Sequence, residues 1–197
     1  MYHLFFNNYI YSRYLENLPI IEYIWTILPA FVLFIISIPS LSILYESERS
    51  SSYNMTLKII GNQWYWNYEL LIKNKHIELD QYQLNDDELK KGDIRLQEFD
   101  NWLYLPINTS IRLLATSNDV IHSWTVPSLG IKLDCIPSRL NQNIINIFKA
   151  GDLIGGCNEI CGSLHAFMAV GIKSLEVDSY QNMSTINNNH FLNTYII

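Results

Sequence analysis

The stretch GGCNEICGSLHAFM, residues 155–168, collects two thiols, one imidazole and one thioether within a short length of chain. The four donor side chains are those of Cys157, Cys161, His165 and Met168. Their spacings of four, four and three residues suit one face of a helix, but the glycines in and before the run weaken a helix. We therefore expect a loop whose donor atoms surround a common centre.

Three kinds of centre use these residue types: a copper site, a zinc site and a Cys157–Cys161 disulfide. Zinc would take two thiolates and two imidazoles in a tetrahedron and has no need of methionine. A thioether is a good ligand for copper, and a single blue-copper site uses two histidines, one cysteine and a weak methionine. The second thiolate is one too many for one copper ion but would bridge two. Spacing alone favours copper and leaves zinc and the disulfide open.

A pair of copper ions requires a second imidazole from elsewhere in the chain. The remaining histidines are His3, His76, His122 and His190. Two of them lie near the termini, and His76 lies in a polar run typical of the surface. His122 ends a strand-like apolar run, VIHSWTVP, where a lone histidine is more often a core residue. The nearby soft donors make His122 the favoured partner.

Composition limits the possible partners and part of the environment. The chain has 197 residues, of which 49% are hydrophobic and 16% charged, so part of it need not face water. Three cysteines make no disulfide framework but suit a small metal or redox site. The net charge of −6 disfavours nucleic acid and favours a basic partner.

An uncharged run occupies residues 23–45, and at about 1.5 Å per residue it is long enough to cross a hydrocarbon core of about 30 Å. Trp25 and Tyr45 lie where interfacial aromatic residues belong. A buried core helix rarely runs this long without a charge, and a signal peptide would be shorter and end at small residues. We predict a transmembrane helix over residues 20–46, with the N-terminus on the inner side because Arg13 precedes the run.

Beyond Ser47, short segments with alternating or β-branched residues recur, separated by turn residues. The strand-like segments are MTLKII, WYWNYELLI, WLYLPI, TSIRLLAT, VIHSWTV, NIINIFK and MAVGIKSLEV. This pattern predicts an all-β sandwich or Greek-key barrel, with residues 83–93 as an exposed loop or short surface helix. The predicted organisation is an N-terminal segment (1–19), the helix (20–46), a linker with the first strand (47–60), the metal domain (61–180) and a tail (181–197).

Four segments in order resemble subunit 2 of cytochrome c oxidase, the haem–copper respiratory enzyme, and the resemblance runs from about Ile21 to Val177. These segments are IEYIWTILPA, GNQWYWNYE, DVIHSWTVPSLGIKLDCIPSRLNQ and CNEICGSLHAFM. The resemblance implies a cupredoxin-like Greek-key β-barrel on the outer face of a membrane, preceded by one transmembrane helix. It implies a dinuclear copper centre whose ligands are His122, Cys157, Cys161, His165, Met168 and the backbone carbonyl of Glu159.

The same resemblance implies further roles. The side chain of Glu159 would approach a magnesium ion shared with subunit 1, and Trp64 would receive electrons from cytochrome c. The implied docking carboxylates are Glu69, Asp100 and Asp119, although two of these three also suit ordinary turns. Glu22 would lie near the inner mouth of a proton pathway, or would simply mark the membrane boundary. One aromatic residue in the run around Trp64 is expected to pack in the core.

The chain departs from the family at several positions. The family usually has two membrane helices and this sequence shows one, so the first is absent, supplied by a separate polypeptide or lost through an incomplete gene model. Cys135 replaces a usual alanine, and we expect a small buried thiol there. Asn62 and Ser138 replace a usual histidine and glycine. None of these changes removes an implied copper ligand.

The implied activity is that of an electron relay in a proton-translocating oxidoreductase, whose haem-bearing subunit 1 reduces oxygen. The expected location is the mitochondrial inner membrane with the copper domain in the intermembrane space, or alternatively a bacterial plasma membrane. Two other functions stay open: a membrane-anchored thiol or copper-transfer protein, and a copper-domain subunit of another terminal oxidase. A thioredoxin-like transfer protein would show a βαβ pattern around its cysteines, which this sequence lacks.

Overall fold

The computed structural model describes residues 18–48, 52–72 and 75–186, and the chain divides between Arg49 and Ser50 into two compact units. Residues 1–17, with His3 and Arg13, lie outside the described residues, as do residues 187–197, with His190. Most of the predicted N-terminal segment and most of the predicted tail therefore fall outside the description.

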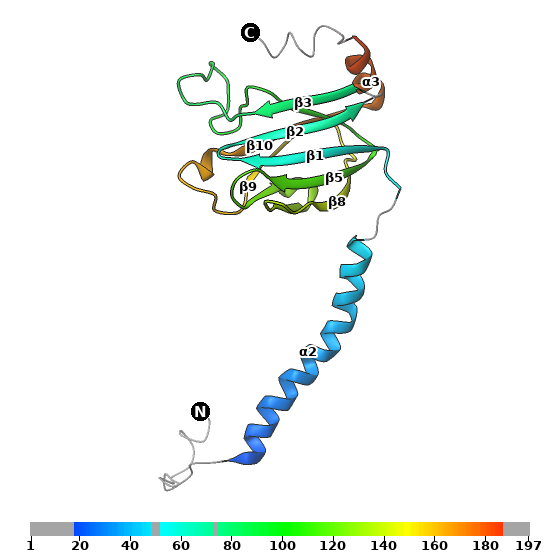
Figure 1. Ribbon diagram of the computed structural model, residues 1–197, viewed down its shortest axis with the longest axis vertical. Helices are drawn as coiled ribbons and strands as arrows, with labels where there is room; N and C mark the ends of the chain where they lie inside the picture. The colour runs from blue at the N-terminus through cyan, green and yellow to red at the C-terminus, as the bar shows by residue number, and fades with distance from the viewer. Residues whose placement is uncertain (1–17, 49–51, 73–74, 187–197) are drawn as a thin grey trace. The chain divides into compact units, whose positions relative to one another are not determined.

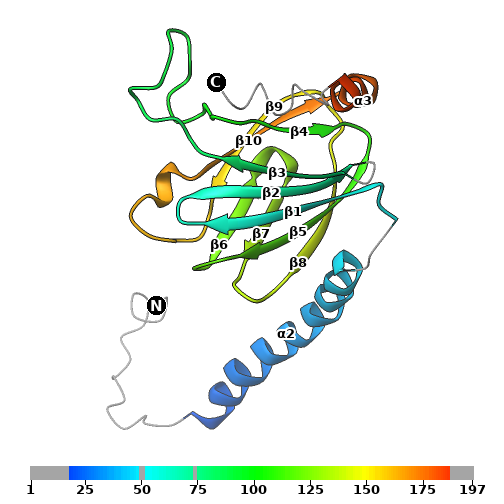
Figure 2. The ribbon, with the colours of Figure 1, turned by 45° about the horizontal axis from the view of Figure 1, so that its top comes forward.

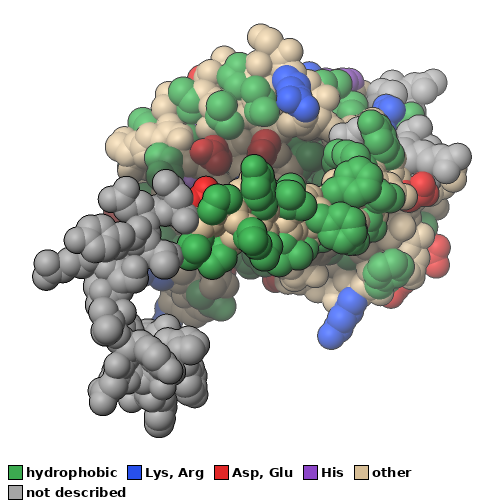
Figure 3. All heavy atoms as spheres, turned by 90° about the horizontal axis from the view of Figure 1, so that it is seen from below, with side chains coloured by type: hydrophobic (Ala, Val, Ile, Leu, Met, Phe, Trp, Pro, Cys, Tyr) green, Lys and Arg blue, Asp and Glu red, His purple; other side chains and the backbone are tan. Residues whose placement is uncertain are grey.

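The first unit is the helix α2, Pro19–Glu48, which extends a little beyond the predicted residues 20–46 at both ends (Figure 1). Pro29 and Pro39 lie within it. Its stretch from Pro19 to Glu46 is long and apolar enough to cross a membrane, and none of it is buried inside the protein. Figure 3 shows the apolar side chains that cover this helix. An apolar helix without a covering core is what the uncharged run predicts.

The second unit consists of two five-stranded sheets (Figure 2). In spatial order, the first sheet contains β3 (Lys75–Gln81), β2 (Tyr65–Ile72), β1 (Met55–Asn62), β5 (Ser110–Ser117) and β8 (Asn141–Asn146). The second contains β4 (Leu103–Pro106), β10 (Ala169–Leu175), β9 (Gly151–Cys157), β6 (His122–Val126) and β7 (Ile131–Cys135). Two pairs, β1 with β5 and β10 with β4, are parallel, and the other pairs are antiparallel.

The hydrophobic core lies between the two sheets because their strands alternate in burial. In β5 every second side chain is buried, and in β7 Ile131, Leu133 and Cys135 face inward. Trp66 and Trp124 are fully buried and are the largest side chains of the core. Trp66 is therefore the packing residue expected in the aromatic run around Trp64. Removing apolar surface of this kind from water stabilises the domain by about 25 cal/mol per Å².

The barrel agrees with the predicted fold class, but some elements lie outside the strand-like segments. The strands β3, β7 and β9 were not among those segments, and α3 (Val177–Ile186) was not predicted. Residues 83–93 form turns joined by a bridge between Gln83 and Phe99, and their side chains are mostly exposed, as expected of a loop. The loop at residues 158–168 connects β9 to β10 and contains a short 3-10 helix, His165–Phe167.

Candidate metal centre

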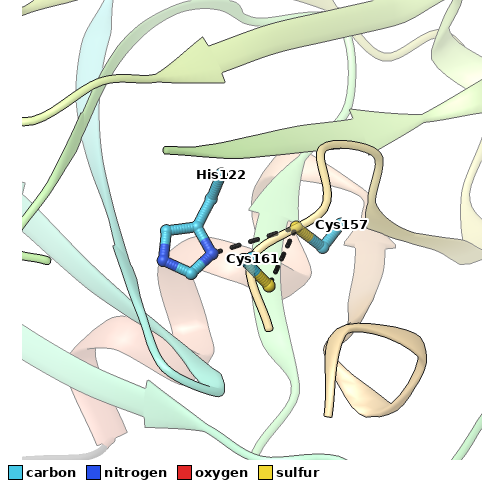
Figure 4. A group of neighbouring side chains, drawn as sticks. All are labelled: His122, Cys157 and Cys161. Carbon is cyan, nitrogen blue, oxygen red and sulfur yellow. Dashed lines mark hydrogen bonds between the residues drawn. The ribbon is translucent and has the colours of Figure 1, made fainter. Parts of the chain in front are cut away.

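Four predicted donor side chains form a continuous series at one end of the barrel. Nδ1 of His122 lies 3.9 Å from Sγ of Cys157, and this sulfur lies 3.9 Å from Sγ of Cys161 (Figure 4). Nδ1 of His165 lies 3.6 Å from Sγ of Cys161. Each imidazole therefore faces a different thiol, and the two thiols face each other. The ligand atoms of His122, Cys157 and Cys161 all lie within 4.8 Å of one another.

His122 is held by contacts on two sides of its ring. It begins β6 and is fully buried, with Gly61 of β1 directly beneath the ring. A methyl group at Gly61 would lie 2.7 Å from Cδ2 of His122, so only glycine leaves room for the imidazole. On the other side, Nε2 lies 2.7 Å from Oδ1 of Asp119. This contact leaves Nδ1 directed toward the thiols.

The two cysteines are positioned by the glycine-rich strand β9. Gly155 is in close contact with Thr125 of β6, where a methyl group would lie 1.9 Å from the Thr125 carbonyl oxygen. Glycine therefore permits the close packing of β9 on β6 that sets Cys157 opposite Trp124. The backbone N–H of Cys157 donates to the carbonyl of Met168 at 2.9 Å and ties both ends of the loop together.

The remaining implied ligands lie in the same loop. The backbone carbonyl of Glu159 is 3.3 Å from Sγ of Cys157, while the Glu159 residue itself is exposed. Met168 is only 2% exposed and lies at the C-terminal end of the loop, where it joins the hydrophobic core cluster with Cys161. The loop thus presents a carbonyl oxygen at its outer side and a buried thioether at its inner side.

The charges at the centre depend on one another. Burial alone raises the pKa of Cys157, but contacts with His122 and with the backbone of Ser123 and Glu159 outweigh it and lower the pKa to about 6. Burial, and after it the charge of Cys157, raises the pKa of Cys161 to about 12. Burial lowers the pKa of His122, but Cys157 and Asp119 raise it by more. Without a cation between them, two adjacent thiolates repel each other, so the arrangement favours a bound cation.

The donor set fits copper on the chemistry of its atoms. Two thiols side by side, with one imidazole outside each, would offer one sulfur and one nitrogen donor to each of two metal ions. The buried thioether and the carbonyl oxygen supply weak fifth and sixth donors, which copper accepts and zinc does not need. The residues present therefore fit the implied group.

Trp64 lies against the same loop. Its ring is partly buried and packs on the core, and Gly162 faces it with a φ of 135°. A methyl group at Gly162 would lie 3.0 Å from Cζ2 of Trp64, so the ring rests on the backbone directly after Cys161. The indole is therefore adjacent to a thiol-bearing residue and partly open to the surface.

The predicted docking carboxylates differ in their surroundings. Oε1 of Glu69 accepts a hydrogen bond from Lys58 at 2.8 Å, which holds the pKa of Glu69 below its usual value, and His76 lies 3.5 Å from Oε2. Asp100 caps the backbone N–H groups of Tyr82 and Asn101, and desolvation raises its pKa. Asp119 is engaged with His122.

The sequence also singled out Glu22 and Cys135. Glu22 occupies the first turn of the exposed helix α2. Cys135 is completely buried, pairs with His122 across β6 and β7, and has a pKa raised to about 12 by burial. The small buried thiol expected at this position is therefore present.

The site also contains residues that the sequence reasoning missed. Gly61 leaves room for the imidazole of His122, and Gln63 contacts the cysteine loop. Asp119, predicted as a docking carboxylate, also contacts His122, a second role that was not predicted. The sequence places Asp119 three residues before His122, and this spacing was the one available signal. Gly61 and Gln63 lie far from their partners in sequence, so their contacts depend on the folded topology.

Comparisons with known proteins match both units of the chain. The family model for the periplasmic domain of cytochrome c oxidase subunit II matches residues 55–175, and the model for the transmembrane domain of the same subunit matches residues 3–43. Cytochrome c oxidase subunit 2 of Drosophila yakuba is 47% identical over 188 residues, which are 95% of this chain and 82% of that protein. The corresponding protein of Branchiostoma floridae is 45% identical over 175 residues, covering 89% and 75%.

A solved structure agrees with the fold. The crystal structure of the periplasmic domain of subunit II of cytochrome oxidase (CoxB) of Bradyrhizobium japonicum superposes with a TM-score of 0.64 at 34% identity. The match covers 73% of this chain and 99% of that chain. The predicted cupredoxin-like barrel and the predicted family are therefore both confirmed.

Proposed function

Because this chain belongs to the family of cytochrome c oxidase subunit II, we propose that its donor cluster holds the two copper ions through which the oxidase receives electrons from cytochrome c. The chain is a membrane-bound subunit of a haem–copper oxidoreductase and has the electron-transfer role of subunit II. The observation that carries the proposal is the series His122, Cys157, Cys161 and His165, in which each imidazole faces its own thiol.

In this proposal the copper ions would be held by the thiolates of Cys157 and Cys161 and by the imidazoles of His122 and His165. Met168 supplies its sulfur and Glu159 its backbone carbonyl. When bound, a thiolate-bridged copper pair accepts and gives up one electron with little change in its ligand positions. The exposed side chain of Glu159 remains free to bind a magnesium ion shared with subunit 1.

The chain's own residues do three things in this function. Gly61 and Asp119 hold the imidazole of His122, so its Nδ1 stays directed at the thiols. The close approach of β9 to β6 holds the start of the loop, in which Cys161 and Met168 are buried and Cys157 is partly buried. Trp64, which rests on Gly162 beside Cys161, offers electrons a short path from the surface to the centre.

Charge and location complete the proposal. An acidic domain attracts a basic cytochrome c, with Glu69, Asp100 and Asp119 as the docking carboxylates. Glu22, in the first turn of α2, lies at the inner mouth of a proton pathway. The oxidase resides in the mitochondrial inner membrane, where the copper domain faces the intermembrane space, and haem-bearing subunit 1 reduces oxygen.

Copper quantitation combined with electron paramagnetic resonance on the full chain in detergent tests the proposal. We expect two copper ions per chain and hyperfine coupling to two equivalent copper nuclei. The variants Cys161→Ser and His165→Ala should lose this spectrum, whereas the control Cys135→Ala should keep it. One ion per chain, or a Cys157–Cys161 disulfide that persists under reducing conditions, would contradict the proposal.

A further inference from the structure

Gln63 touches both halves of the candidate centre. It lies between β1 and β2, and its backbone N–H donates to Oδ2 of Asp119 at 2.6 Å. The other oxygen of this carboxylate faces Nε2 of His122. The side-chain amide of Gln63 donates from Nε2 to the carbonyl oxygen of Cys161 at 2.7 Å. One residue is therefore bonded both to the residue that orients the imidazole and to a thiol-bearing residue.

The two halves come from β6 and from the loop after its neighbour β9, and Gln63 reaches both from the turn between β1 and β2. His122 begins β6, Cys161 lies in the loop after β9, and Gln63 belongs to the opposite sheet. A bond from one short turn to both halves fixes the distance between them. Gln63 also precedes Trp64, and its Nε2 shares with the indole the space above Gly162, where a methyl group would lie 3.1 Å from Nε2.

We propose that Gln63 is a positioning residue for electron transfer, which ties the cysteine loop to the Asp119–His122 pair and sets the indole of Trp64 against the loop. The inference rests on the proposed copper function and deepens it. The residue is exposed, and its side chain is held by one hydrogen bond. The proposed role therefore depends on this hydrogen bond and not on the size of the side chain alone.

The donor atom gives the role an electrostatic consequence. An amide N–H bonded to the Cys161 carbonyl places a partial positive charge on the backbone of a thiol-bearing residue, which would stabilise the reduced, more electron-rich form of the centre. Loss of this donor should therefore lower the reduction potential of the centre. A purely structural glutamine would not produce such a shift.

Two variants separate the hydrogen bond from the shape of the side chain. Gln63→Glu keeps the size of the residue but replaces the donor by an acceptor, and Gln63→Leu removes polarity altogether. The exposed Gln97, in the loop before β4, provides the control Gln97→Leu. Each full-length variant is prepared in detergent with and without copper ions, in a Cys135→Ala background so that only the two loop thiols react.

The first readout needs no metal. In the metal-free chain, both Gln63 variants should speed alkylation of the loop thiols by iodoacetamide, because the loop is released from Asp119, and Gln97→Leu should not. In the copper-loaded chain, both should lower the reduction potential, make the two copper nuclei spectroscopically unequal and slow electron uptake from reduced cytochrome c by about 10–100-fold.

Unchanged alkylation, potential and spectrum in both Gln63 variants would overturn the inference. If Gln63→Leu lowers the potential and Gln63→Glu does not, the hydrogen bond is not the cause, and the inference fails equally. A native chain that binds no copper pair refutes the proposed function instead. In that case the alkylation rates still decide whether Gln63 ties the loop in place.

Discussion

Oδ1 of Asp119 lies 2.7 Å from Nε2 of His122, so a carboxylate that the sequence predicts for docking also orients a candidate metal ligand. The carboxylate also accepts hydrogen bonds from the backbone N–H groups of Gln63 and Val120 and from the hydroxyl of Ser117. Burial alone raises the pKa of Asp119, but the contact with His122 and these backbone bonds lower it. The carboxylate is therefore charged at neutral pH and holds the ring in one orientation.

Replacing this carboxylate should weaken copper binding without removing a ligand. We expect Asp119→Ala to lower copper affinity about 10–100-fold, which is the usual effect of removing the hydrogen-bond partner of a metal-bound histidine. Competition with a copper chelator measures the affinity. Asp87→Asn, at an exposed position in the loop between β3 and β4, is the control and should have no effect. Equal affinities for Asp119→Ala and the native chain would show that Asp119 does not support copper binding.

The close contact between Gly61 and the ring of His122 predicts a strict requirement for glycine at position 61. In Gly61→Ala the new methyl group would meet the imidazole at 2.7 Å, so the ring must move or the strands must separate. We expect a loss of about 1–3 kcal/mol in the free energy of unfolding, together with a distorted copper spectrum. Gly156→Ala, whose methyl group would meet only ordinary contacts at 3.7 Å, is the matched control. Urea unfolding measures the free energy of unfolding, and electron paramagnetic resonance of the folded, copper-loaded chain measures the copper spectrum.

Trp64→Ala should affect the passage of electrons more than the binding of cytochrome c. The ring rests on Gly162 beside Cys161, so its loss lengthens the path to the centre while the surrounding carboxylates stay in place. Stopped-flow electron uptake should slow strongly, whereas the dissociation constant should change little. The neighbouring Tyr65→Ala, which removes a ring stacked 4.5 Å from Tyr82, is the comparison. A matched loss of rate and affinity in Trp64→Ala would mean that Trp64 only packs.

Lys58 partly neutralises a predicted docking carboxylate. Its ammonium group donates to Glu69 at 2.8 Å on the exposed side of the first sheet. Lys58→Gln should therefore raise the association rate of a basic cytochrome c, by about twofold at low salt for one unit charge at a separation of about 10 Å in water. Lys132→Gln, on β7 of the other sheet, is the control. A gain that persists at high salt would not be electrostatic.

Asp100 should make the domain less stable as the pH rises. Desolvation raises its pKa above the usual value despite two backbone hydrogen bonds, so the folded chain binds the proton more tightly than the unfolded chain. The free energy of unfolding then falls as the pH rises through the interval between the two pKa values. Asp100→Asn should be more stable than the native chain near neutral pH, and the difference should vanish in acid. Thermal unfolding of both proteins from acid to neutral pH checks this prediction. A stability difference that does not change with pH would contradict the raised pKa of Asp100.

Much of the fold follows from alternating hydrophobic residues, and the exceptions have physical causes. In β5 the buried positions alternate regularly, and the sequence shows the same alternation. The strand β9 contains three of its seven residues as glycine, a composition typical of loops. It is a strand because residues 151–156 pair with β10, while glycine at position 155 permits the close approach to Thr125 of β6. The strand β3 begins with polar residues because it lies at the edge of its sheet.

The candidate donor residues could be selected from the sequence, but the contacts that hold them in place could not. Thiol and imidazole side chains spaced four residues apart are typical of a metal site. Cys157, Cys161 and His165 could therefore be selected from the sequence alone. The contact between Gln63 and Cys161 joins residues 98 positions apart, and the one between Gln63 and Asp119 joins residues 56 positions apart. No local pattern contains such pairs, since they depend on which strands become neighbours.

The sequence distances within the centre also impose an order on its maturation. Cys157 and Cys161 are neighbours as soon as they are synthesised, but the imidazole of His122 reaches Cys157 across 35 residues, only once β6 and β9 have paired. Distant pairings form late in folding. A newly made chain therefore carries two adjacent thiols, vulnerable to oxidants, before it has a finished receptacle for metal. The complete set of donor atoms therefore exists only in the folded barrel, because one of its two imidazoles arrives with β6 and both of its thiols with the end of β9.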